Sequence, residues 1–333
     1  MQCSPRFAIL PLLAVVFWSG TACGVAPPDP LLLEAQEGSK DAEFRLGLRY
    51  FQNRDPAGKN LTEALRWFNA AAQQRNASAE EYLGVMYQGG LGVPQNYEQA
   101  AQWYLKAAGQ GSLFAPVFLG ELYESGKGVP QSYAEAAKWY LKAANNGNSA
   151  RGQWHLGLLY YQGNGVPQNL DEAVKWERKA AEHNYHPAIN MLGMIYSENG
   201  NYPEAVRWFG RAASQGDVGA QVKLADIYYE GHPGVDRNYN AAAQWYQSAA
   251  TAGNPEAQNR ISQMYYDGRG VPRDYVAAYM WASFSAAQDN YDGRKILDNL
   301  EFVMSSEQKA EAQKMARDYR RKGGDTPFNI FLR

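Results

Sequence analysis

The chain has 333 residues, of which 45% are hydrophobic and 20% are charged, and this ordinary balance excludes extensive disorder. The 32 Lys and Arg residues nearly balance the 34 Asp and Glu residues, so the net charge is only −2. The whole chain therefore gives no electrostatic reason to expect nucleic acid or an anionic membrane surface as a partner.

The first 22 residues are typical of an export signal. An apolar run over residues 7–18 is followed by small residues that lead to Cys23. The run is shorter than the roughly 20 residues that a membrane-spanning helix needs. Two alternatives remain open: a lipoprotein processing site that would make Cys23 the lipidated N-terminus, and ordinary cleavage after Ala22 or Ala26. We expect an exported protein, either periplasmic or an outer-membrane lipoprotein that faces the periplasm.

A repeat follows a short proline-rich segment. Residues 23–40 contain three prolines and predict an extended tether. Over residues 41–290, seven tryptophans recur at intervals of 36, 36, 37, 32, 37 and 36 residues, and seven tyrosines keep step with them. The two series are Trp67, Trp103, Trp139, Trp176, Trp208, Trp245 and Trp281, and Tyr50, Tyr87, Tyr123, Tyr160, Tyr196, Tyr228 and Tyr265.

Each unit contains two apolar segments of helical period. The first holds a Leu-Gly pair in five units, for example Leu83 and Gly84. A glycine inside a helix costs roughly 0.5–1 kcal/mol relative to alanine, so we expect another helix to approach closely at this glycine. The second segment carries a tryptophan between alanines, as at Ala100, Trp103 and Ala107.

The start of the second helix has its own signals. In four units a Val-Pro pair precedes it, and the glycines before that pair permit positive φ, so the first helix ends and the chain turns back. Capping-box pairs are expected at Asn60 and Glu63, Asn96 and Gln99, Ser132 and Glu135, Asn169 and Glu172, and Asn201 and Glu204. Units six and seven keep only the cap residue, Asn238 or Asp274.

The repeat resembles the Sel1-like repeat family, which is related to the tetratricopeptide repeats and has a longer loop between the helices. The resemblance runs from about Asp41 to Asp289, and residues 83–111 and 119–147 are two full copies. Unit one lacks the Gly-Val-Pro loop, and unit five shortens it to residues 197–200. The resemblance implies an all-α fold, an α-solenoid of about seven antiparallel helix pairs in a right-handed superhelix. Residues 291–322 are expected to form C-terminal capping helices, and residues 323–333 a flexible tail.

Groups that could support catalysis are few. His183 and His186 form a pair. The chain has only two other histidines and the folded part has no cysteine, so a metal site lacks further ligands. Ser306 and Lys309 match the Ser-x-x-Lys of penicillin-recognising enzymes without the companion motifs of those enzymes. We expect no catalytic residue, no metal and no cofactor. A cell-wall-directed or β-lactam hydrolase is the alternative.

A partner-binding face is predicted on the first helix of each unit, which usually lines the inner surface of helix-pair solenoids. On that helix, unit four carries large apolar side chains at positions that differ between units, and such side chains dominate interfaces. The predicted residues are Trp154, Leu158, Tyr161, Val117, Met194 and Tyr229. Cover by a neighbouring loop or by the C-terminal tail, or burial by superhelical twist, is the alternative.

The resemblance implies a non-enzymatic scaffold or regulator that binds partner proteins in the bacterial cell envelope. A secreted host-interaction factor is a second alternative. Protein partners are expected and nucleic acid is not. Membrane contact is expected only through a lipid anchor at Cys23.

Overall fold

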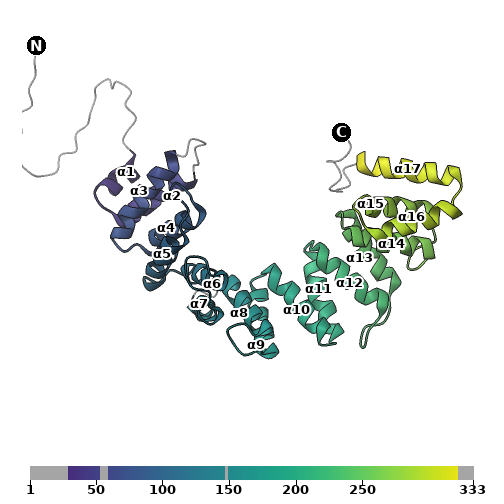
Figure 1. Cartoon of the computed structure of the whole chain (residues 1–333), viewed down its shortest axis with the longest axis horizontal. Coiled ribbons are helices and arrows are strands. Elements are labelled where there is room, and N and C mark those ends of the chain that lie inside the picture. The colour runs from purple at the N-terminus through teal and green to yellow at the C-terminus, as the bar shows by residue number, and fades with distance from the viewer. Residues whose placement is uncertain (1–28, 53–58, 147–148, 322–333) are drawn as a thin grey trace, which may run out of the picture. The chain divides into compact units, whose positions relative to one another are not determined.

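A computed structural model describes residues 29–52, 59–146 and 149–321. The predicted export signal, Cys23 and the tail 323–333 lie outside these described residues. Within the described ranges the chain forms 17 α-helices and no strand, which confirms the all-α class (Figure 1). The helices belong to two compact units of the chain, Met1–Asn76 and Ala77–Arg333.

Seven helix pairs follow one another along the chain, from α2 and α3 to α14 and α15 (Figure 1). The helices of the first compact unit are α1 Pro30–Gln36, α2 Lys40–Gln52 and α3 Lys59–Gln73. Those of the second are α4 Ala77–Gly89, α5 Tyr97–Gly109, α6 Ala115–Ser125, α7 Tyr133–Asn146, α8 Ala150–Gln162, α9 Leu170–Glu182, α10 His186–Glu198, α11 Tyr202–Ser214, α12 Val218–Glu230, α13 Tyr239–Thr251, α14 Pro255–Asp267, α15 Tyr275–Ala286, α16 Tyr291–Val303 and α17 Ser306–Arg321.

Two details of the first compact unit correct the sequence predictions. Residues 30–36, expected in an extended tether, form α1, because Pro30 stands in the first turn and the Asp29 carboxylate accepts a backbone N–H there. Ala35 of α1 is buried and packs with Leu46 of α2. Asn60, expected as a cap, lies inside α3, which begins one residue earlier.

The Leu-Gly pair marks the close approach of the two helices of a pair, as the sequence predicts. A Cβ added to Gly84 of α4 would lie 2.4 Å from the ring of Tyr104 on α5. Gly120 of α6 stands in the same relation to Tyr140 of α7, at 2.3 Å. The glycine therefore makes room for the aromatic side chain that follows the repeated tryptophan.

In three of the pairs, the loop between the two helices also contacts the preceding unit. Gly128 has φ of +70°, and a Cβ there would lie 2.3 Å from the Tyr97 carbonyl carbon in the preceding unit. Gly165 makes the same approach to Tyr133, and Gly270 to Tyr239. Only glycine allows this contact, both for its backbone conformation and for lack of space.

Unit five departs from this arrangement. Only residues 199–201 separate α10 from α11, so the loop that covers the start of the preceding second helix is missing. Leu170, the first residue of α9, is accordingly 37% exposed. The shortened loop thus leaves an apolar side chain at the surface of unit four.

Capping fixes the helix starts. Asn96, Ser132, Asn169 and Asn201 each accept the backbone N–H of the residue three positions later. At α17, Ser305 and Gln308 exchange both bonds of a capping box.

The C-terminal helices cover the last repeat. Leu300 of α16 and Ala312 of α17 are buried with Ala278 and Ala282 of α15. The ring of Tyr319 on α17 also lies 5.4 Å from that of Trp281. In the described part of the chain, no helix has the length and apolar character to cross a membrane.

Candidate partner-binding site

Three of the predicted binding residues lie on α8, and we call Trp154, Leu158 and Tyr161 the α8 patch. Each of the three is half-buried. Met194 on α10 is 44% exposed, and Tyr229 on α12 is half-buried. All five side chains therefore keep surface that a partner can contact.

Val117 does not share this surface, and its prediction as an exposed binding residue is wrong. It is 3% exposed and packs with Tyr140 and Leu156. Its register on the helix, two residues before the Leu-Gly pair, faces neighbouring helices and not solvent. Val222, in the same register of α12, is 4% exposed.

The same register explains why Trp154 is only half exposed. Its ring lies 5.8 Å from that of Tyr185, at the start of the next unit, and 4.5 Å from that of His155. In the following unit, Asn190 occupies this register and donates a 2.7 Å hydrogen bond to Asp217 at the start of α12. Trp154 thus belongs both to the packing between units and to the surface.

Hydrogen bonds hold the two tyrosines of the face. The Tyr161 hydroxyl donates to the Glu198 carboxylate, which together with burial raises the pKa of Tyr161. Arg269 donates to the Tyr229 hydroxyl at 2.8 Å. The rings are therefore oriented before any partner arrives.

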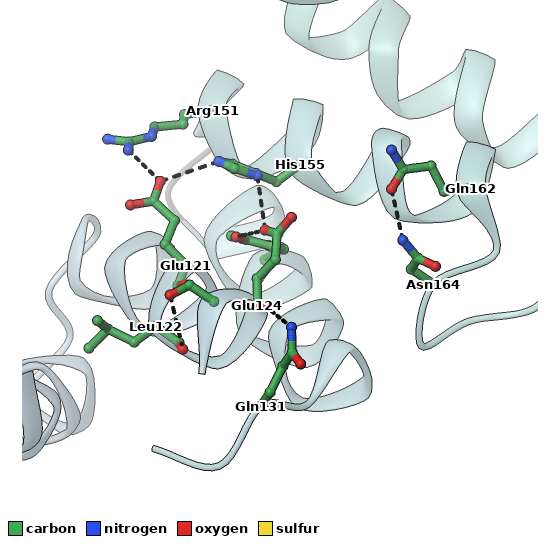
Figure 2. Close-up of polar contacts among 10 residues, drawn as sticks. Glu121, Leu122, Glu124, Gln131, Arg151, His155, Gln162 and Asn164 are labelled. Atoms are coloured by element: carbon green, nitrogen blue, oxygen red, sulfur yellow. Dashed lines mark hydrogen bonds and ion pairs between the residues drawn. The ribbon is translucent and has the colours of Figure 1, made fainter. Parts of the chain in front are cut away.

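A charged cluster of five residues, Glu121, Glu124, Tyr140, Arg151 and His155, joins α6 and α7 to α8. In Figure 2 the His155 ring lies between the two glutamates, and Arg151 reaches Glu121. The His155 Nε2 atom lies 3.2 Å from Glu121 Oε1, and Nδ1 lies 3.5 Å from Glu124 Oε2. The Tyr140 hydroxyl donates to Glu124 Oε2 at 2.6 Å, and its ring stacks on that of His155 at 4.4 Å.

These contacts set the charges of the cluster. Burial lowers the pKa of His155, but the carboxylates of Glu121 and Glu124 outweigh this effect, so the pKa is raised overall. His155 and then Tyr140 hold the pKa of Glu124 below its usual range, against the effect of burial. Because both ring nitrogens face carboxylates, His155 is suited to bridging helices and not to general-base catalysis.

Part of this cluster could be predicted from the sequence. Glu121 and Glu124 occupy first-helix positions whose residue differs from unit to unit, and Arg151 and His155 follow in unit four. Arg151 and His155 lie four residues apart on α8, and residues at this spacing share one helix face. Which face meets α6 depends on contacts between units, and these the repeat period alone does not specify.

Glu177 is a second feature that is absent from the sequence predictions. This α9 side chain is fully buried, and its two carboxyl oxygens have no hydrogen-bond partner among the described residues. It lies against Gly157 of α8, and burial raises its pKa to about 9, so the carboxyl is protonated at neutral pH. Five other units place an aromatic ring here: Phe68, Tyr104, Tyr140, Phe209 and Tyr246. The sequence signal is a Trp-Glu pair where five other units have Trp-Tyr or Trp-Phe and unit seven has Trp-Ala.

The structure also places the candidate catalytic groups. His183 and His186 are exposed at the turn between α9 and α10. Lys309 contacts the Glu301 carboxylate at 2.8 Å, and Ser306 is the first residue of α17. Among the described residues, no group of three or more His, Cys, Asp or Glu side chains could hold a metal ion.

Known proteins share this architecture. The family model described as Sel1 repeat matches residues 40–76, 77–112, 117–148, 150–185, 186–217, 218–254 and 255–290. The chain belongs to the Sel1 repeat family. Its seven repeats coincide with the seven helix pairs, so the predicted α-solenoid is confirmed. Sel1 repeat proteins are typically protein–protein interaction scaffolds.

Several solved structures are similar to this chain. A Sel1 repeat protein from Oxalobacter formigenes is 32% identical over 73% of this chain and 96% of its own, with a TM-score of 0.59. The C-terminal part of a TPR repeat-containing protein from Cytophaga hutchinsonii is 18% identical over 76% and 99%, with a TM-score of 0.52. A protective antigen of uropathogenic Escherichia coli with an SLR fold is 26% identical over 88% and 78%, with a TM-score of 0.42. Comparison with the curated proteins gives no match.

Proposed function

We propose that this Sel1 repeat protein is a non-enzymatic scaffold or regulator in the bacterial cell envelope. It binds a partner protein on the face that carries the α8 patch, Met194 and Tyr229. The observation that carries this proposal is the accessible apolar surface of these side chains, at positions where the repeats differ from one another. Positions that serve packing alone carry nearly the same residues from unit to unit.

The chemistry of the face suits protein binding. Leu158 and Met194 offer apolar contact area, and Trp154 and Tyr161 are aromatic anchors of the kind that dominate interface energies. Because Tyr161 is held by Glu198 and Trp154 by Tyr185, little side-chain freedom is lost when a partner binds. His155 of the charged cluster contacts Trp154, so the cluster gives the α8 patch a polar border.

Site-specific cross-linking tests the proposed face. A photoreactive amino acid at Met194 or Leu158 should trap a protein partner in living cells. The same group at Phe302, which is 89% exposed on α16, is the matched control and should trap none. Equal trapping from the three positions, or none from Met194 and Leu158, would contradict the proposed face.

A binding measurement with the trapped partner follows. Leu158→Asp should weaken binding at least about tenfold, because it places a charge in the apolar part of the interface. Phe302→Asp should leave the affinity unchanged. Trp154→Ala is a poorer probe, since it also removes a packing contact with Tyr185.

The envelope location rests on the predicted export signal. We expect the protein in intact cells to be protected from added protease and to become accessible when the outer membrane is opened. Labelling with a radioactive fatty acid, compared between wild type and Cys23→Ala, distinguishes a lipoprotein from a soluble periplasmic protein. Recovery of the whole pool with cytoplasmic markers would disprove the envelope location.

A further inference from the structure

A second exposed apolar surface lies on the edge formed by α5, α7 and the loop before α6. Its side chains are Leu105, Leu113, Phe114 and Leu141, with exposures of 42%, 49%, 62% and 41%. They are four of the eleven large hydrophobic side chains that are exposed in the described residues. We call these four residues the α5–α7 edge.

The α5–α7 edge is held together by contacts between neighbouring units. Lys142 of α7 donates a 3.2 Å hydrogen bond to the Ala108 carbonyl near the end of α5. Leu113 and Lys142 line one cavity together with Ala108. Leu105 and Leu141 directly precede Lys106 and Lys142 in equivalent positions of the two repeats.

This edge is basic, although the whole chain is nearly neutral. Residues 99–120 and 136–170 contain no Asp or Glu, while Lys106 of α5 and Lys138 of α7 are exposed and Lys142 of α7 is half-buried. Glu135 neutralises Lys138, so Lys106 and Lys142 carry the positive charge of the edge. Glu135 pairs with Lys138 at 2.6 Å, and Glu81 accepts a hydrogen bond from Ser112.

We propose that the α5–α7 edge docks on an anionic lipid surface. Interfacial binding combines the burial of apolar side chains with the attraction of lysines to anionic headgroups, and the edge supplies both. Protein interfaces are enriched in Arg, Tyr and Trp and depleted in Lys, whereas the edge offers Leu, Phe and Lys. This contact goes beyond the proposed function, because it uses residues other than the α8 patch and is independent of lipidation at Cys23.

A spin label reports on this contact at a single residue. The label is placed by Phe114→Cys, and in a second chain by Phe302→Cys, in the full chain with Cys3→Ser and Cys23→Ser. Both chains are mixed with vesicles of equal parts phosphatidylglycerol and phosphatidylcholine, and with vesicles of phosphatidylcholine alone. Accessibility of the label to oxygen, which concentrates in the acyl region, is compared with its accessibility to a water-soluble nickel complex.

We expect the label at position 114 to become accessible to oxygen on the anionic vesicles only, while the label at position 302 stays in water. The position 302 label controls for attachment through the apolar N-terminal segment, since that attachment would leave both labels in water. Lys106→Gln should weaken the response at position 114 about fivefold.

Two results would overturn the proposal. One is a label at position 114 that stays in water on anionic vesicles, which would favour an acidic protein surface as the occupant of the edge. The other is equal insertion of both labels, which would show contact without a defined edge. Neither result bears on partner binding at the α8 patch.

Discussion

The Glu177→Gln substitution tests how far a buried carboxyl limits the stability of this repeat array. Burial raises the pKa of Glu177 from its ordinary value of 4.5 to about 9. Between these two values the native state holds a proton that the unfolded chain has released, so the free energy of unfolding falls as pH rises. The slope approaches 1.36 kcal/mol per pH unit, and the resulting loss between pH 5 and pH 8 is about 4 kcal/mol.

Glutamine has nearly the same shape as glutamic acid and does not titrate. We therefore expect the stability of Glu177→Gln relative to wild type to rise by about 4 kcal/mol from pH 5 to pH 8. Any constant cost of burying the amide leaves this slope unchanged. Urea unfolding followed by tryptophan fluorescence at each pH measures it. Glu182→Gln, at an exposed position of the same helix, is the control and should follow wild type. Parallel profiles for wild type and Glu177→Gln would refute the reasoning.

Three further substitutions test the packing, the charged cluster and the caps. Gly128→Ala should destabilise the fold more than Gly216→Ala in thermal unfolding, because only the Cβ at 128 would meet the Tyr97 backbone. Gly216→Ala should cost about 1–2 kcal/mol for its positive φ alone. Equal losses of stability would disprove the contact between the Gly128 loop and the preceding unit. His155→Gln should lower the free energy of unfolding most below pH 6.5, the ordinary pKa of histidine. The loss of stability should shrink as pH rises through the raised pKa of His155 in the native state. A loss that does not change with pH would show that the charge of His155 is not involved. Ser305→Ala should cost about 1 kcal/mol and speed hydrogen exchange in the first turn of α17, and unchanged exchange would speak against the cap.

Most of the fold could be predicted because neighbouring units pack in the same way and therefore repeat the same residues. The Leu-Gly pair predicts a close helix approach, and the Gly84 contact with Tyr104 confirms it. The prediction of an extended tether over residues 23–40 is wrong at residues 30–36. Pro30 in fact begins α1, because a proline in the first turn has no N–H to leave unpaired. The prediction of Asn60 as a cap is also wrong. Unit one lacks the Gly-Val-Pro loop, and its second helix, α3, already begins at Lys59.

The candidate site was predicted less completely, because it depends on contacts between units. Helical period alone placed Val117 on a free face, yet its register packs against neighbouring helices. The bridge from His155 to two glutamates requires knowing which faces of α6 and α8 meet. Glu177 could have been found from the sequence alone, since an acidic residue stands there at a position that is aromatic in five other units.

Three departures from the repeat lie in or next to unit four. Glu177 replaces an aromatic residue, His155 bridges to the preceding unit, and the short loop of unit five leaves Leu170 uncovered. A protonated, unpaired carboxyl in the core stabilises nothing, because each buried polar group without a partner costs about 1–3 kcal/mol. In a solenoid, stability is approximately a sum over units and their interfaces, so these costs fall on unit four and its neighbours. The α8 patch lies on the same unit, and ligand-binding elements are often drawn from the less stable parts of a protein. These three departures therefore lie close to the α8 patch, where the proposed partner would bind.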